Sequence, residues 1–158
     1  MERADRYADA VQSANEELIG FAESCSEEQW ATLVPGENWS VGALVHHCAL
    51  GNEVATSWLR EMVERGGVPT TSEELDAMNA RHAIEFAEVG IAETVALLRS
   101  NGAAAIAYIR TLSDEDLDRE AVFAPGGGTT VTVERFASVL GRHGLTHLGH
   151  ARQALGGT

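Results

Sequence analysis

Histidines are the residues of this sequence whose type and spacing could do chemistry. His143, His147 and His150 follow one another at intervals of four and three residues. In a helix these intervals place side chains on one face, and residues four apart lie about 5–6 Å apart at Cβ. The same face extends an apolar stripe that consists of Val133, Phe136, Leu140 and Ala154. Imidazoles on a core-facing stripe need hydrogen-bond partners or a metal ion.

A metal ion would explain this pattern. The ring nitrogens of His143 and His147 can converge on one ion at about 2.0–2.1 Å, and His150 could replace His143 because a spacing of three also works. A third ligand must come from another helix, and His47 is the natural candidate there. Three neutral imidazoles leave coordination positions open, which is typical of a catalytic site. All-nitrogen ligation suits zinc or nickel and does not choose between them.

Two further histidines have weaker claims to this site. His46 is about 100° around the helix from His47, so we expect it at the surface or at the rim of the site. His82 belongs to another apolar stripe and is expected to be a hydrogen-bonded core or boundary residue that could also line a pocket. The alternative for the whole set is a structural bundle whose buried histidines bond to one another or to the backbone.

Four amphipathic helices are predicted to position these residues. Apolar residues recur three and four apart over residues 5–23, 40–65, 71–112 and 132–155. Ser40 is the expected N-cap of the second helix, and a break in register predicts a kink near Gly90 in the third. Ser26 and Thr71 open capping boxes. Residues 113–116 are expected to form a turn or short helix and residues 124–129 a flexible loop. No strand is predicted, so we expect an all-α, up-down four-helix bundle that forms one domain over residues 1–158.

Composition limits the possible partners. The chain has 158 residues, of which 44% are hydrophobic, and a formal net charge of −13. An acidic surface repels phosphate backbones and anionic lipids, so neither nucleic acid nor a membrane is an expected partner. Cys25 and Cys48 make no disulfide framework, and Cys48 is expected to be a small core residue. With no signal peptide or long apolar run in view, we expect a cytoplasmic protein.

Two segments resemble the motifs of the DinB-like (DinB/YfiT) metalloproteins. The run Trp39-Ser-Val-Gly-Ala-Leu-Val-His-His47 resembles that family's W-[ST]-x-x-x-[LIV]-[LIV]-x-H signature. The run from Thr132 to Gly149 resembles its closing T-x-x-x-L…H-x-x-x-H-L motif. By position, the resemblance assigns the metal ligands to His47, His143 and His147. It places His150 where many relatives carry Gln.

The resemblance also implies a chemistry. The family includes the N-terminal domain of mycothiol-dependent maleylpyruvate isomerase and bacillithiol transferases, so the expected cofactors are a divalent metal and a thiol such as mycothiol. The metal would lower the pKa of the thiol and create a nucleophile for an S-transferase reaction. The chain ends after the fourth helix, which weighs against the isomerase itself. Family habit further suggests a homodimer.

Three functions therefore stay open from the sequence. The first is a metal-dependent transferase whose pocket lies between the second, third and fourth helices, with Trp58, Asn79 and His82 as its lining. The second is a non-catalytic metal- or ligand-binding stress-response module. The third is the purely structural bundle.

Overall fold

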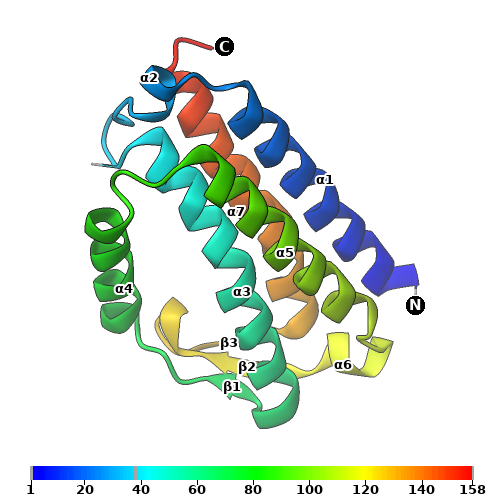
Figure 1. Ribbon diagram of the computed structural model, residues 1–158. Coiled ribbons are helices and arrows are strands. Elements are labelled where there is room, and N and C mark those ends of the chain that lie inside the picture. The colour runs from blue at the N-terminus through cyan, green and yellow to red at the C-terminus, as the bar shows by residue number, and fades with distance from the viewer. Residues whose placement is uncertain (1, 38, 158) are drawn as a thin grey trace.

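Four long helices form the protein, as predicted. The computed structural model describes residues 2–37 and 39–157 (Figure 1). The long helices are α1 (Glu2–Ser24), α3 (Val41–Arg65), α5 (Ile91–Arg110) and α7 (Val133–Ala154). The four-helix bundle expected from the sequence is therefore the observed fold.

The four helices pack in a fixed neighbour order. α1 and α3 each pack against α5 and α7, so α1 and α3 lie diagonally across the bundle. The colours of Figure 1 show that α3 and α5 run in one direction, while α1 and α7 run in the opposite one. Successive long helices therefore do not alternate in direction as the expected up-down order requires, because α4 lies between α3 and α5 in the chain. The consequence for function is that α3 and α7, which carry the histidines, are direct neighbours.

Local sequence signals fix most helix ends. Ser26 and Thr71 open capping boxes at α2 (Glu27–Trp30) and α4 (Ser72–Glu85), as predicted. Ser40 caps α3, because its hydroxyl accepts a hydrogen bond of 3.0 Å from the backbone N–H of Ala43. The short helix α6 (Asp114–Asp118) likewise begins with a capping box at Ser113. These caps satisfy backbone N–H groups that the first turn of a helix leaves without partners.

The third helical region is two helices. α4 ends at Glu85, and α5 begins at Ile91 with Gly90 as its N-cap, so the predicted kink near Gly90 is a complete break. Figure 1 shows α4 standing apart from the bundle beside α3. The apolar residues of Leu75–Val89 and those of Ile91–Leu112 are out of register with one another. This break explains why, because the two helices face different parts of the molecule.

A small sheet is present that the sequence did not predict. Its strands are β1 (Gly67–Val68), β2 (Glu120–Phe123) and β3 (Thr129–Thr132). β1 pairs with β2 in parallel and β2 pairs with β3 antiparallel. The segment expected to be a flexible loop contains the 3-10 turn η1 (Ala124–Gly126) and closes this hairpin. Strands of two to four residues are too short to show a period of two, which is why the pattern missed them.

The apolar core has two parts. One is at the sheet end of the bundle and the other beside α2. Their largest fully buried members are Leu59, Met62, Ile109 and Leu117 in the first part and Leu44, Leu98 and Leu148 in the second. Among the described helices, none is both long and apolar enough to cross a membrane.

Gly42 allows the first turn of α3 to pack against α2. A Cβ atom at this position would lie 2.4 Å from Nε1 of Trp30. That indole is buried and its N–H donates a hydrogen bond of 2.7 Å to the carbonyl oxygen of Val89. Trp30 therefore ties α3 to the segment between α4 and α5, and it has little room to move.

We predict that Gly42→Ala lowers the free energy of unfolding by about 1–3 kcal/mol, because overpacking displaces the indole. The matched control is Gly20→Ala on α1, where nothing lies within 4 Å of the new methyl group. That variant should gain roughly 0.5–1 kcal/mol from helix propensity. Urea unfolding followed by circular dichroism measures both changes. Equal stability of Gly42→Ala and the unaltered protein would show that the indole of Trp30 can move aside without cost.

Candidate metal centre

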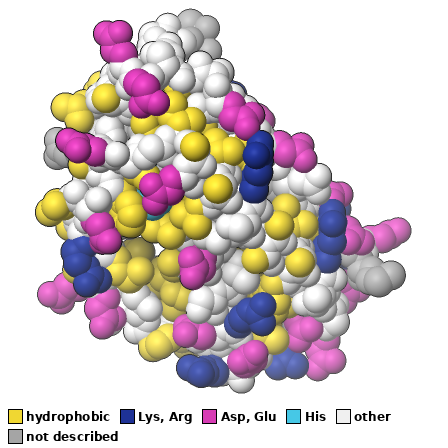
Figure 2. All heavy atoms as spheres, viewed as in Figure 1, with side chains coloured by type: hydrophobic (Ala, Val, Ile, Leu, Met, Phe, Trp, Pro, Cys, Tyr) yellow, Lys and Arg dark blue, Asp and Glu magenta, His cyan; other side chains and the backbone are white. Residues whose placement is uncertain are grey.

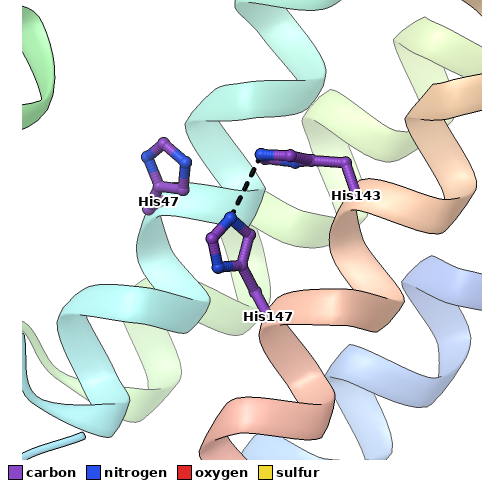
Figure 3. Close-up of side chains that lie close together, drawn as sticks. All are labelled: His47, His143 and His147. Carbon is purple, nitrogen blue, oxygen red and sulfur yellow. Dashed lines mark hydrogen bonds between the residues drawn. The ribbon is translucent and has the colours of Figure 1, made fainter. Parts of the chain in front are cut away.

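Three histidines come together between α3 and α7. His47 comes from α3, and His143 and His147 come from successive turns of α7 (Figure 3). One ring nitrogen from each can be chosen so that the three lie within 4.8 Å of one another. The ring centroid of His47 is 5.5 Å from that of His143 and 5.2 Å from that of His147. The structure thus brings together the three residues named from the sequence, and their role as metal ligands stays a prediction.

The spacing of the nitrogen atoms fits a shared ion. Nε2 of His143 and Nε2 of His147 are 3.1 Å apart. Two nitrogen ligands at 2.0–2.1 Å from one ion, at angles between square and tetrahedral, lie about 2.9–3.4 Å apart. A hydrogen bond between two neutral imidazoles also allows this distance, but it needs one of the two atoms to carry a proton. The arrangement is therefore ready for a metal without a rearrangement of α7.

The surroundings keep the three imidazoles neutral, which is the form that binds metal. Burial, followed by the closeness of His143 and His147, lowers the pKa of His47 to about 3. Burial, followed by the closeness of His143, lowers the pKa of His147 to about 4. Burial also lowers the pKa of His143, although Glu37 opposes that shift. No proton has to leave these rings at neutral pH.

A carboxylate that the sequence reading did not single out lies behind His147. Glu37 belongs to the turn between α2 and α3, which an antiparallel bridge between Leu33 and Ser40 closes. Its Oε2 atom is 3.8 Å from Nδ1 of His147, and its Oε1 atom contacts Nδ1 of His150. Carboxylates behind a ligating histidine commonly fix the orientation of its ring. The signal in the sequence was only a Pro-Gly turn before Trp39, which does not reveal where a side chain points.

His147 is thus shared between two groups of potential ligands. Its Nε2 atom faces His143, whereas its Nδ1 atom is buried without a hydrogen bond and faces Glu37. Glu37, His147 and His150 also have ligand atoms within 4.8 Å of one another. His150 is exposed and contacts the far side of Glu37, so it belongs to this second group and not to the cluster with His47.

The expectation for His46 is wrong. Its side chain is buried, with 2% of the residue exposed, instead of lying at the surface or rim. α4 and the segment after it cover this face of α3, and the ring centroid of His46 lies 4.1 Å from that of Phe86. Nδ1 of His46 is buried without a hydrogen bond. A bundle of four helices alone would leave that face to solvent, which is why the periodicity misplaced the residue.

His82 has the two properties expected of it. It is buried, and its Nε2–H group donates a hydrogen bond of 3.1 Å to the carbonyl oxygen of Ala43. It also lines the cavity beside the histidine cluster. The ring of Trp39 stacks on His82 at 5.2 Å and meets His47 edge-on at 4.9 Å. These contacts hold α4 against the start of α3.

A cavity of about 580 Å³ opens beside the cluster. His47 and His143 line it, and Trp58, Asn79 and His82 line it as expected. Gly51 and Val54 on α3 face this cavity, and so do Phe136 and Leu140 of the predicted apolar stripe on α7. Of the predicted stripe on α7, Val133 is fully buried, whereas Phe136 and Leu140 are only partly buried.

Cys48 is a core residue, as expected. It is buried, and burial raises the pKa of its thiol to about 12. A thiol that stays protonated at neutral pH is a poor nucleophile. Neither Cys48 nor the partly buried Cys25 forms a disulfide in the described structure.

The fold and the cluster together define a four-helix-bundle protein with a three-histidine site between two helices, beside an internal cavity. A family model described as the DinB superfamily matches residues 10–151, which is most of the chain. The chain therefore belongs to the DinB superfamily.

One solved structure shows the same fold. YfiT from Bacillus subtilis, described as a probable metal-dependent hydrolase with an unusual four-helix bundle topology, aligns with a TM-score of 0.76. The alignment covers 100% of this chain and 90% of that one at 19% sequence identity. No curated protein matches the sequence. At this identity, the likeness to YfiT establishes the fold alone.

We predict that the metal-free protein loses stability on acidification. Burial lowers the pKa of His46 to about 4, whereas an unfolded histidine titrates near 6.5. Well above pH 6.5 the histidine is neutral in both states and its contribution to stability is fully present. Between pH 6.5 and 4 it is mainly the unfolded state that takes up the proton, so stability falls. From pH 7 to pH 5 this residue alone should lower the free energy of unfolding by about 2 kcal/mol.

Urea unfolding at several pH values measures this loss. The control variant His46→Phe keeps an aromatic ring beside Phe86 and removes the titrating group. Its unfolding free energy should fall less steeply with pH. An identical pH slope in both proteins would contradict the assignment of the effect to His46.

Proposed function

We propose that the protein binds one divalent metal ion through His47, His143 and His147 and acts as a metal-dependent enzyme on a small molecule held in the cavity. The observation that carries the proposal is the convergence of three neutral imidazoles, with two Nε2 atoms 3.1 Å apart, at the edge of a cavity of about 580 Å³. Membership of the DinB superfamily and the described activity of YfiT support it.

The side chains have separate roles in this proposal. When bound, a zinc or nickel ion supplies a Lewis acid with coordination positions open to the cavity. His47 and His143 line the cavity, so they would hold the ion at its edge. His147 does not line it, and its Nδ1 atom faces Glu37, whose Oε2 atom is 3.8 Å away. The mostly apolar lining would strengthen electrostatic interactions at the site once a bound molecule displaces the water there.

The reaction we favour is S-transfer from a low-molecular-weight thiol, such as mycothiol, to an electrophile. Among the described residues that line the cavity, Glu85 is the sole carboxylate, and it is an exposed residue of α4. A hydrolytic metal site commonly uses a carboxylate as general base, as the helical HExxH enzymes do. A thiol would release its proton to solvent when it binds a metal ion and would need no such base, so the lining fits S-transfer better.

Hydrolysis is the second candidate. YfiT, which shares the fold over the whole of this chain, is described as a probable metal-dependent hydrolase. His82 lines the cavity and donates from Nε2, so its Nδ1 atom is left as an acceptor that could take a proton. A non-catalytic metal- or ligand-binding module would use the same cluster without turnover.

We predict that the untagged protein reconstituted with zinc or nickel holds close to one ion per chain. His47→Ala should lower the occupancy by at least about tenfold, because two neutral imidazoles leave the ion incompletely ligated. The control is His46→Gln, since His46 lies outside the cluster. Elemental analysis after gel filtration measures the occupancy. If His47→Ala retains the metal, or the unaltered protein takes up none, the site assignment is wrong.

Metal-loaded protein should also consume an electrophile such as 1-chloro-2,4-dinitrobenzene only when a thiol is supplied. A panel of mycothiol, bacillithiol and glutathione, followed by absorbance, measures this rate. His47→Ala should lower kcat/KM by about 100-fold or more, since the metal contributes several kcal/mol to the transition state. Thiol-independent cleavage of p-nitrophenyl esters would instead support hydrolysis. No turnover with metal bound would support the binding module.

A further inference from the structure

The cavity has two chemically different ends. His47 and His143 line one end. Trp58, Phe123 and Phe136 line the other, and their ring centroids are 5.2–6.2 Å apart. In Figure 2, hydrophobic side chains gather around the hollow between α3 and α4. An occupant of the whole cavity therefore presents one end to the histidines and the other to three aromatic rings.

The helices set the length of this occupant. Trp58 follows His47 by eleven residues on α3, and Phe136 precedes His143 by seven on α7. At 1.5 Å of rise per residue these separations are roughly 16 Å and 10 Å. A molecule of the size of two or three fused or linked rings, or a medium-length aliphatic chain, spans such a distance.

The lining selects against charge on this occupant. Arg81 and Glu85 are the two lining residues with formal charge at neutral pH among those described, and both are exposed residues of α4. The chain as a whole carries a net charge of −13. A charged group that enters the aromatic end would lose its hydration without gaining an ionic partner there, which is costly.

Amide groups provide limited polar recognition between the two ends. Asn52 donates a hydrogen bond of 3.2 Å to Asn15, whose own amide donates to the carbonyl oxygen of Leu98 at 3.0 Å. The side chain of Asn79, which also lines the cavity, has no hydrogen bond within the described structure. Such groups suit an uncharged carbonyl, hydroxyl or amide on the occupant.

Gly51 keeps the passage between the two ends open. A Cβ atom at this position would meet just one side-chain atom, Cε1 of His143, at 4.0 Å. This glycine differs from Gly42 and Gly102, where a Cβ atom would lie 2.4–2.5 Å from Trp30 and Asn15. No close packing requires a glycine at position 51, and any side chain there would extend into the cavity next to the histidines.

We propose that this cavity binds an uncharged, largely apolar molecule with an aromatic or branched aliphatic body, which forms the non-thiol substrate of the reaction. The apolar body packs against Trp58, Phe123 and Phe136, and the reactive end passes Gly51 to reach His47 and His143. Its role as a substrate rests on the proposed function. The binding itself does not rest on it, because the aromatic end of the cavity is formed by residues outside the histidine cluster.

The uncharged fluorophore N-phenyl-1-naphthylamine tests the binding. Its fluorescence should rise and saturate at one molecule per chain in both metal-free and zinc-loaded protein. Gly51→Leu should weaken the binding by about tenfold or more, because the new side chain fills the passage. Gly20→Leu is the matched control, since position 20 is open and on the exposed face of α1. In the metal-free, unaltered protein, 1-naphthol should displace the fluorophore, whereas 1-naphthalenesulfonate should compete about tenfold less well.

Each result decides the proposal. Equal affinity in Gly51→Leu and Gly20→Leu, or equal competition by the sulfonate, would overturn it. Circular dichroism and zinc content establish that Gly51→Leu is folded and keeps its cluster; should it fail to fold, Gly51→Ala and the competition in the unaltered protein carry the decision. Fluorophore binding without any zinc uptake would refute the metal function alone. Zinc uptake without fluorophore binding would refute the substrate class alone.

Discussion

The close approach of α7 to α1 is the contact on which the site depends. A Cβ atom at Gly141 would lie 2.9 Å from the carbonyl oxygen of Ala10, and one at Gly144 would lie 3.2 Å from Leu18. Glycine at both positions lets the two backbones come together, and this turns the adjacent face of α7 toward α3. His143 and His147 occupy that face. A larger residue at position 141 would push α7 away and separate its histidines from His47.

The position of α4 determines which histidines are accessible. α4 is outside the bundle, and three contacts hold it or its flanks: His82 with Ala43, Ser72 with the carbonyl oxygen of Pro125, and Trp30 with Val89. It covers the face of α3 on which His46 lies, so this imidazole is buried. α4 does not close the cavity beside the face of α3 that carries His47, so a small molecule can reach His47 and His143.

The sequence predicted the helices and the three clustered histidines because each depends on local periodicity. Residues four apart on α7 share a face whatever surrounds them, and the periodicity of α3 separates His47 from His46. The choice of His143 over His150 came from the family resemblance. Burial could not be predicted in the same way. His46 is sealed by a helix that the pattern merged into its neighbour, and the stripe that contains Phe136 and Leu140 borders a cavity instead of a solid core. Glu37 reaches His147 through a turn whose geometry no periodicity encodes.

The charges around the cluster connect the proposed ion to the proposed substrate. Three neutral imidazoles would leave the full charge of a divalent ion in place, and Glu37 is separated from it by the ring of His147. In an apolar cavity that charge is screened weakly, so an anionic ligand such as a thiolate would be strongly favoured at the open positions. The same lining disfavours charge farther along the cavity, toward Trp58. An enzyme built in this way would therefore combine an anionic sulfur at the histidine end with an uncharged electrophile in the aromatic end, and it would keep the two in a fixed orientation.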